Sequence, residues 1–130
     1  VRRIWNTYRD RTLPYWLTGN SIAIIPNVLW SDERSYQFAF EGIEKGGTVA
    51  VSTLGCIKKK EDREYFNQGL ARMVKTIQPD TIVNYSQTPD DICAKYKKQG
   101  IEIIELENYT LTIHNKLTSA AKEGKNHGRR

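Results

Sequence analysis

The spacing of hydrophobic positions changes several times along this chain, and each change marks an expected element. Residues 21–30 (SIAIIPNVLW) are apolar at nearly every position, which is typical of a strand covered on both faces, although Pro26 interrupts its ladder. Three shorter runs, residues 48–55, 80–86 and 101–109, are rich in β-branched residues. Beyond them, residues 109–114 (YTLTIH) alternate apolar and polar positions, which favours an exposed or edge continuation of the last strand.

Between these runs, apolar residues recur at helical spacing. In residues 31–43, Ser31 is the expected helix cap and Gly42 the expected end. The longest helix is expected over residues 59–79, and its inner stripe is Phe66, Leu70, Met73 and Ile77. A third helix is expected to follow Thr88, which would cap it with Pro89 at the first helical position, and to end at Gly100; its inner face would be Ile92, Cys93 and Tyr96.

Alternating strands and helices predict an α/β fold of repeated right-handed βαβ units with a mostly parallel sheet of about four strands. Such a sheet is either a truncated open sheet or an incomplete barrel. A helix carrying Ile4, Trp5 and Tyr8 precedes the first strand, as the end of a further unit would. We expect one domain over residues 1–115 and a basic, mobile tail over residues 116–130.

The net charge of +5 lies at the two ends of the chain. Residues 116–130 carry five Lys or Arg against Glu123, residues 1–11 carry four Arg against Asp10, and the body between them has a net charge of −2. The tail is therefore the segment that could bind nucleic acid, and its alternative role is to keep the protein in solution. No apolar stretch is long enough to cross a membrane and no secretory signal is recognisable, so we expect a cytoplasmic protein with Cys56 and Cys93 as free thiols.

Residues 15–56 (YWLTGNSIAIIPNVLWSDERSYQFAFEGIEKGGTVAVSTLGC), with FNQGLARM and the strand ending at Tyr85, carry a family resemblance. They resemble the carboxyl-terminal half of the bacterial and phage family called domain of unknown function 4417. The resemblance runs from about Trp5 to about Tyr85, and WSDERS, EGI, KGGTVAVST and GC are its most specific pieces. It implies an origin in phages, prophages or mobile elements, and it assigns no particular activity. It also implies that a further segment usually precedes the helix containing Trp5, so this chain would present an open sheet edge to a partner.

The carboxyl ends of parallel strands share one edge of a sheet, so the residues that follow each expected strand form a candidate rim. Asp32 and Glu33 could act as an acid–base pair, with Ser52 and Cys56 as further catalytic candidates. The backbone around Gly55, with Thr53 and Lys58, could receive a small anionic ligand. The other ligand-binding candidates on this rim are Trp30, Tyr85 and Ser86.

Each candidate also has a structural explanation. Ser and Thr commonly satisfy backbone groups at strand ends, and Asp32 with Glu33 would suit the first turn of a helix. Trp30 could be a core or rim anchor, and Cys56 a buried, inert thiol instead of a reactive one beside a basic run. No metal site is expected, because His114 and His127 lie far from any paired ligand, and the cofactor is unknown.

Three functions remain open, since the chain lacks the common nucleotide-binding, zinc-protease and serine-hydrolase motifs. The first is a small-ligand-binding or enzymatic domain with its site at the strand ends, which the polar rim favours. The second is a nucleic-acid-binding accessory protein, and the third is an interaction module that acts on a host or element partner.

Overall fold

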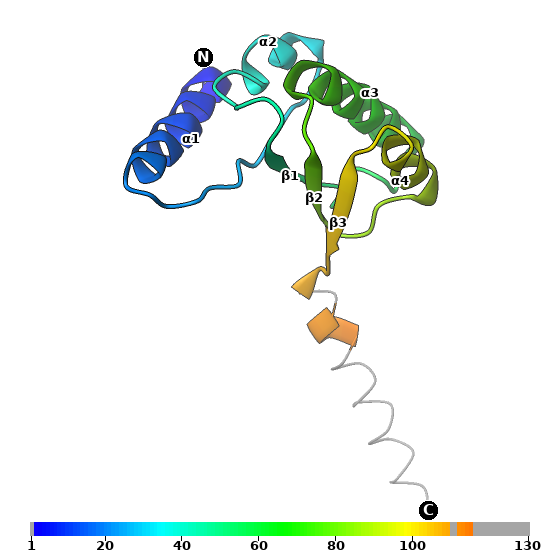
Figure 1. Ribbon diagram of the computed structural model, residues 1–130. Coiled ribbons are helices and arrows are strands. Elements are labelled where there is room, and N and C mark those ends of the chain that lie inside the picture. Colours follow the sequence, from blue (N-terminus) through cyan, green and yellow to red (C-terminus); the bar gives the residue numbers. More distant parts are fainter. Residues whose placement is uncertain (1, 110–111, 116–130) are drawn as a thin grey trace, which may run out of the picture.

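The computed structural model describes residues 2–109 and 112–115 of the chain. In chain order the elements are α1 (Arg2–Gly19), the 3-10 helix η1 (Glu33–Ser35), α2 (Tyr36–Ala39), β1 (Thr48–Ser52), α3 (Lys60–Ile77), β2 (Thr81–Tyr85), α4 (Asp90–Lys97) and β3 (Glu102–Leu106). Figure 1 shows the three strands side by side, with α3 and α4 above them and α1 set apart at the amino end. The expected tail over residues 116–130 lies outside the described residues, and the domain limits stay a prediction.

The three strands form one parallel sheet in the order β1-β2-β3. Thr48 pairs with Thr81 and Thr81 with Glu102, so the strands run without a stagger in their pairing. α3 connects β1 to β2 and α4 connects β2 to β3, as in consecutive βαβ units. The α/β prediction is therefore confirmed, and the sheet is open, not closed into a barrel.

The first expected strand is reduced to a single parallel bridge between Asn27 and Ala50. Ala50 N–H donates to the carbonyl of Pro26 at 2.8 Å, and Val28 N–H donates to the carbonyl of Ala50 at 2.8 Å. Proline has no N–H to give to β1, which shortens the ladder. The expected buried strand, ending near Pro26 or continuing through a bend, is thus not formed, and the sheet has three strands instead of about four, although the chain does run beside β1 where a fourth strand would lie.

The helix expected over residues 31–43 is a short 3-10 turn followed by the single turn of α2. Ser31 does not cap it. Instead, the Ser35 hydroxyl donates to the carbonyl of Asp32 at 2.7 Å and accepts from Ser31 N–H at 3.0 Å. This local side-chain bonding competes with a regular helix start. Gly42 ends the segment with a φ of +69°, as expected for a glycine after a helix.

Two predictions near the carboxyl end were also wrong. Pro89, not Thr88, is the N-cap of α4, because the Thr88 hydroxyl instead accepts a hydrogen bond from the Asn84 side chain at 2.8 Å. Tyr109 and residues 112–115 are helical and do not continue the last strand. Thr112 N–H donates to the carbonyl of Asn108 at 3.0 Å, which is the helical pattern, and Asn is a favoured residue at a helix start.

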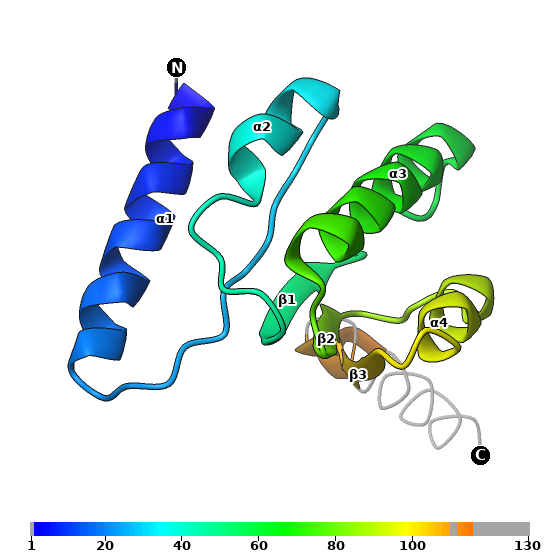
Figure 2. The same cartoon turned by 45° about the horizontal axis from the view of Figure 1, so that its top comes forward.

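The core lies on one face of the sheet. Val49, Val51 and Ile82 point from the strands toward the helices, where they meet the predicted α3 stripe of Phe66, Leu70, Met73 and Ile77. The cluster also contains Ile92 and Tyr96 of α4, Ala39 and Phe40 around α2, and Val28 and Ile101. The α3 stripe and the inner residues Ile92 and Tyr96 are thus confirmed, whereas Cys93 is only half-buried. Figure 2 shows α3 and α4 along one side of the strands, with α1 set apart from them.

Candidate functional site

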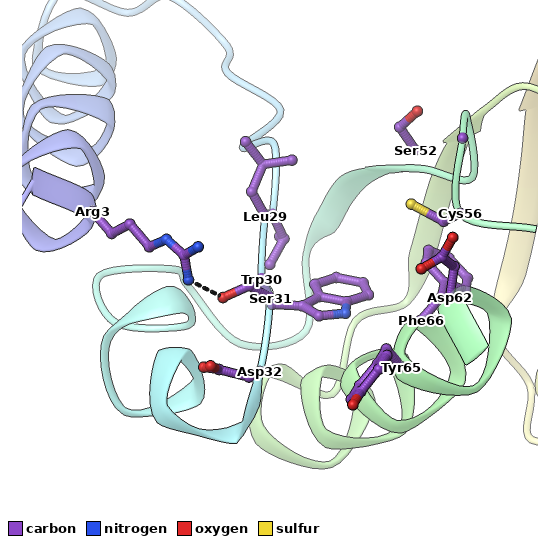
Figure 3. Close-up of a pocket in the computed structure, with 12 residues that line it drawn as sticks. Arg3, Leu29, Trp30, Ser31, Asp32, Ser52, Cys56, Asp62, Tyr65 and Phe66 are labelled. Carbon is purple, nitrogen blue, oxygen red and sulfur yellow. Dashed lines mark hydrogen bonds between the residues drawn. The ribbon is translucent and has the colours of Figure 1, made fainter.

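A pocket of about 510 Å³ opens where the chain leaves the Asn27 bridge and where β1 ends. Its volume falls within the range of roughly 300–1,000 Å³ that is usual for sites of small organic ligands. Figure 3 shows the lining side chains, which come from both loops, from the first turns of α3 and from α1. Its lining residues are Arg3, Val28, Leu29, Trp30, Ser31, Asp32, Ser52, Gly55, Cys56, Asp62, Tyr65 and Phe66.

Trp30 forms an aromatic wall of this pocket. Its ring lies 5.5 Å from the Phe66 ring and 6.3 Å from the Phe40 ring, measured between centroids. Its indole also rests directly on Gly69 of α3, where a β-carbon would overlap the ring. Trp30 is therefore anchored in the core on one side while its other side lines the pocket, as an anchor at the rim would be.

The acidic side of the pocket is Asp32. Its carboxylate accepts from Arg34 at 2.7 Å, and this hydrogen bond, with the nearby charges of Arg34 and Arg3, lowers the pKa of Asp32 below its ordinary value. Asp32 is thus ionised at neutral pH and suits a ligand-binding role better than that of a proton donor. Glu33 lines a different depression together with Tyr36 and Gln37, so the structure does not bring the two carboxylates together in this pocket.

The loop after β1 supplies Ser52, Gly55 and Cys56. Cys56 N–H donates to the carbonyl of Thr53 at 3.1 Å, and Gly55 has a φ of +80°, which is the geometry of a tight turn that favours glycine. The N–H of Leu54 donates to the Ser52 hydroxyl at 3.2 Å. Two of the amides in this turn are therefore occupied within the loop, which leaves few for a bound anion.

Thr53 points away from the pocket and into a buried network around Asn84 of β2. The Asn84 amide nitrogen donates to the Thr53 hydroxyl at 3.1 Å, to the carbonyl of Ser86 at 2.9 Å and to the Thr88 hydroxyl at 2.8 Å. Its oxygen accepts from Thr53 N–H at 3.2 Å. Asn84 is 1% exposed, so this fully bonded amide fixes the loops after β1 and β2 relative to each other.

The remaining predicted site residues lie outside the pocket. The Tyr85 hydroxyl donates to the side chain of Asn108 at 3.3 Å, and Ser86 N–H donates to the carbonyl of Leu106 at 2.9 Å, so both belong to the seam between β2 and the chain after β3. Lys58 is exposed and does not line the pocket. Of the ten candidates, the structure gathers Trp30, Asp32, Ser52, Gly55 and Cys56, and their roles stay predictions.

Sequence reasoning missed Arg3, Asp62 and Tyr65 as pocket residues. Arg3 donates to the Ser31 hydroxyl at 2.5 Å from α1, a contact 28 residues apart that no local pattern could reveal. Asp62 and Tyr65 sit on the first turns of α3, beside the core residue Phe66. The sequence signal for Asp62 and Tyr65 was a helix that begins directly after the candidate loop, because such a helix places its first polar residues at the same edge of the sheet.

Within residues 2–109 and 112–115, no group of three or more His, Cys, Asp or Glu side chains could hold a metal ion. Cys56 and Cys93 are both unbridged, as predicted. Among the described helices, none combines the length and the apolar character that crossing a membrane would require.

Comparison with known proteins gives a lineage. The profile of the family described as domain of unknown function (DUF4417) matches residues 1–109. The chain is 34% identical to the Gene 1 protein of Mycobacterium phage L5 over 85 residues, which are 65% of this chain and 37% of that protein. It is 31% identical to the Gene 1 protein of Mycobacterium phage D29 over 84 residues, 65% of this chain and 31% of that protein.

The chain thus spans about a third of the length of the curated relatives it matches. No solved structure matches it. The family resemblance and the phage association predicted from the sequence are confirmed, whereas the placement in the carboxyl-terminal half of the family stays a prediction.

Proposed function

This chain belongs to the DUF4417 family of domains of unknown function, and from that premise we propose that it binds a small organic ligand in the pocket between Trp30 and the loop after β1. The observation that carries the proposal is that Trp30, Asp32 and Ser52 all line one pocket of about 510 Å³ at the carboxyl ends of the strands. Ligands of open parallel sheets bind at this edge, because its loops are held by rigid strands.

The lining indicates the class of ligand. The lining contains two carboxylates, Asp32 and Asp62, and one guanidinium, Arg3, which donates to Ser31; Arg34, from outside the lining, donates to Asp32. Trp30 and Tyr65 offer aromatic surface to an apolar or cationic group. We therefore favour a ligand with an amino or guanidino cation and an apolar or aromatic part. A small anionic ligand is the alternative, and Arg3 is the lining residue that supports it.

The experiment is calorimetric titration with small aromatic ligands of different charge. 2-Phenylethylamine and phenylacetate share an aromatic ring, and AMP adds a phosphate. We expect the amine to bind and the carboxylate not to bind. An excess of about one hundred times Kd should stabilise the fold by about 2.7 kcal/mol.

Asp32→Asn should abolish amine binding, because it removes the carboxylate that lines the pocket. Glu33→Gln is the matched control: it removes the same charge one residue away, outside the pocket, and should leave binding unchanged. Equal loss in both variants would mean that only net charge matters. Binding of phenylacetate or AMP that needs Arg3 would instead support the anionic ligand.

Two further predictions lie outside this proposal. Nucleic-acid binding by residues 116–130 concerns a segment outside the described residues, and it predicts an affinity that falls steeply with salt. The cytoplasmic location also stays a prediction.

A further inference from the structure

The two carboxylates of the pocket lining differ in what they already bind. The Asp32 carboxylate pairs with Arg34 at 2.7 Å. The Asp62 carboxylate lines the same pocket, and it forms no ion pair or side-chain hydrogen bond with any residue that the structure describes. The oxygens of Asp62 are therefore available to a cation in the pocket.

Arg3 supplies the guanidinium of the lining. It donates to the Ser31 hydroxyl at 2.5 Å and forms no ion pair within residues 2–109 and 112–115. The nearby Asp32 does not take its donors, because the charge of that carboxylate is met by Arg34. A guanidinium has five N–H donors in a planar fork that matches a carboxylate, so most of the Arg3 donors remain available to an anion.

Arg3 and Asp62 lie on different walls of the pocket. Arg3 comes from α1 and Asp62 from the first turn of α3, and Figure 3 shows the Trp30 ring between them. Unpaired charges are ordinary on a protein surface, but these two line a pocket of ligand size with an aromatic wall. The pocket thus offers a cationic and an anionic group on opposite sides of an indole.

We propose that the ligand of this pocket is dipolar, with an ammonium group and a carboxylate at opposite ends of an aromatic or aliphatic spacer. The spacer would lie on Trp30, and the carboxylate would meet Arg3. The ammonium would lie toward Asp32 and Asp62. This inference rests on the proposed function and narrows it, because it joins the cationic and the anionic alternative in one molecule.

Two related ligand classes fit less well. The charges of an α-amino acid sit on neighbouring atoms, whereas Arg3 and Asp62 do not pair with each other and lie on opposite sides of Trp30. A phosphate carries nearly two negative charges at neutral pH. It would meet net repulsion, because the lining has two carboxylates and one guanidinium.

Three ligands built on one frame test the proposal by calorimetric titration of the full chain. 2-Phenylethylamine carries the ammonium alone, 4-(2-aminoethyl)benzoate adds a carboxylate at the far end of the ring, and phenylalanine adds one beside the ammonium. We expect the benzoate to bind about tenfold more tightly than 2-phenylethylamine, which is the gain of one charge-assisted hydrogen bond. Phenylalanine should bind no more tightly than 2-phenylethylamine.

Variants of the two charged residues locate the gain. Arg3→Gln should remove the advantage of the benzoate without weakening 2-phenylethylamine. The matched control Arg9→Gln removes the same charge from the same helix, at a residue that lines a different depression, and should keep the advantage. Asp62→Asn should weaken both amines about fivefold, whereas Glu64→Gln on the same helix, outside the pocket lining, should not.

The outcomes separate this inference from the proposed function. If 2-phenylethylamine binds but the far carboxylate adds nothing, or phenylalanine binds most tightly, the further inference fails and the proposed function stands. An advantage that survives Arg3→Gln also overturns the inference, because another group would then hold the carboxylate. Binding of none of the three ligands overturns both. The comparison of ligands on the unaltered chain decides if Arg3→Gln loosens α1.

Discussion

Gly69 is the position at which the packing of the pocket wall can be tested most directly. A β-carbon there would lie 2.5 Å from Cε2 of Trp30 and closer still to Nε1 and Cδ1. Carbon atoms in proteins approach to about 3.5–4.0 Å, so Gly69→Ala must push the indole outward by about 1 Å or more. Trp30 can move only toward the pocket, because Phe66 and Phe40 hold its other side.

The expected change in the free energy of unfolding is the difference between two opposing effects. Overpacking of a core costs about 1–3 kcal/mol, whereas replacing Gly by Ala inside a helix stabilises by about 1 kcal/mol. We expect a net loss of about 1–2 kcal/mol, which lowers the Tm of a domain of this size by about 5–15 °C. The displaced ring should also narrow the pocket and weaken ligand binding.

Thermal unfolding followed by circular dichroism measures the net loss of stability. Gly19→Ala is the matched control, since Gly19 lies at the end of α1 with no atom within 4 Å of an added β-carbon, and should change the Tm little. Trp30→Phe should partly rescue Gly69→Ala, which gives a coupling of about 1 kcal/mol in a double-mutant cycle. A Gly69→Ala variant more stable than the parent would refute the reasoning, because helix propensity would then act without a clash.

Three further predictions follow from the same contacts. Asn84→Ala removes a buried side chain that donates to the Thr53 and Thr88 hydroxyls and accepts from Thr53 N–H, and should destabilise the fold by about 2–4 kcal/mol in urea unfolding, whereas Asn67→Ala on α3 should cost much less. Because the pKa of Asp32 is lowered in the fold, the small contribution of its carboxylate to the free energy of unfolding should be constant above about pH 5. It should be lost as the pH falls through the lowered pKa, and a difference in Tm between wild type and Asp32→Asn that widens toward acid would contradict this. Arg11→Met removes donors to the carbonyls of Ala39 and Glu41 at 3.0 and 3.1 Å, and should speed hydrogen exchange in α1 without altering that of β2.

The elements that were predictable from sequence are those whose pattern is local. The α3 stripe repeats at helical spacing and ends at Gln78, which adopts a φ of +51° just before Pro79. The strands β1 and β2 alternate buried and half-buried positions, as their β-branched residues suggested. Such signals depend on neighbours within a few residues, which the sequence displays directly.

The errors arose where a residue far away in the sequence determines the local structure. Residues 21–30 are apolar throughout, which suggested burial on both faces, yet Ile22, Ile25 and Leu29 are about half exposed or more. A pattern of hydrophobic residues indicates that burial would be favourable, but it does not show whether another element packs on those residues. Thr88 likewise resembled a helix cap, but Asn84 uses its hydroxyl instead.

The candidate site likewise has a part that was predictable from the sequence and a part that was not. Its edge of the sheet was predictable, because parallel strands bring their carboxyl ends together. Which residues line the pocket was not predictable, because the packing of α1, η1 and α3 places Arg3 and Asp62 in the pocket and Glu33 outside it.

The loop after β1 joins a structural role to a functional one. Thr53 turns inward to Asn84, and Gly55 provides the turn, so the backbone path is set by β2 and by a glycine. Ser52 and Cys56 on either side are thereby held toward the pocket. The Ser52 hydroxyl accepts from Leu54 N–H at 3.2 Å, and the Cys56 thiol donates to the carbonyl of Leu54 at 3.7 Å, so a change at either residue alters a local bond of the turn as well as the pocket lining. A change at Thr53 or Asn84 would instead move the whole wall.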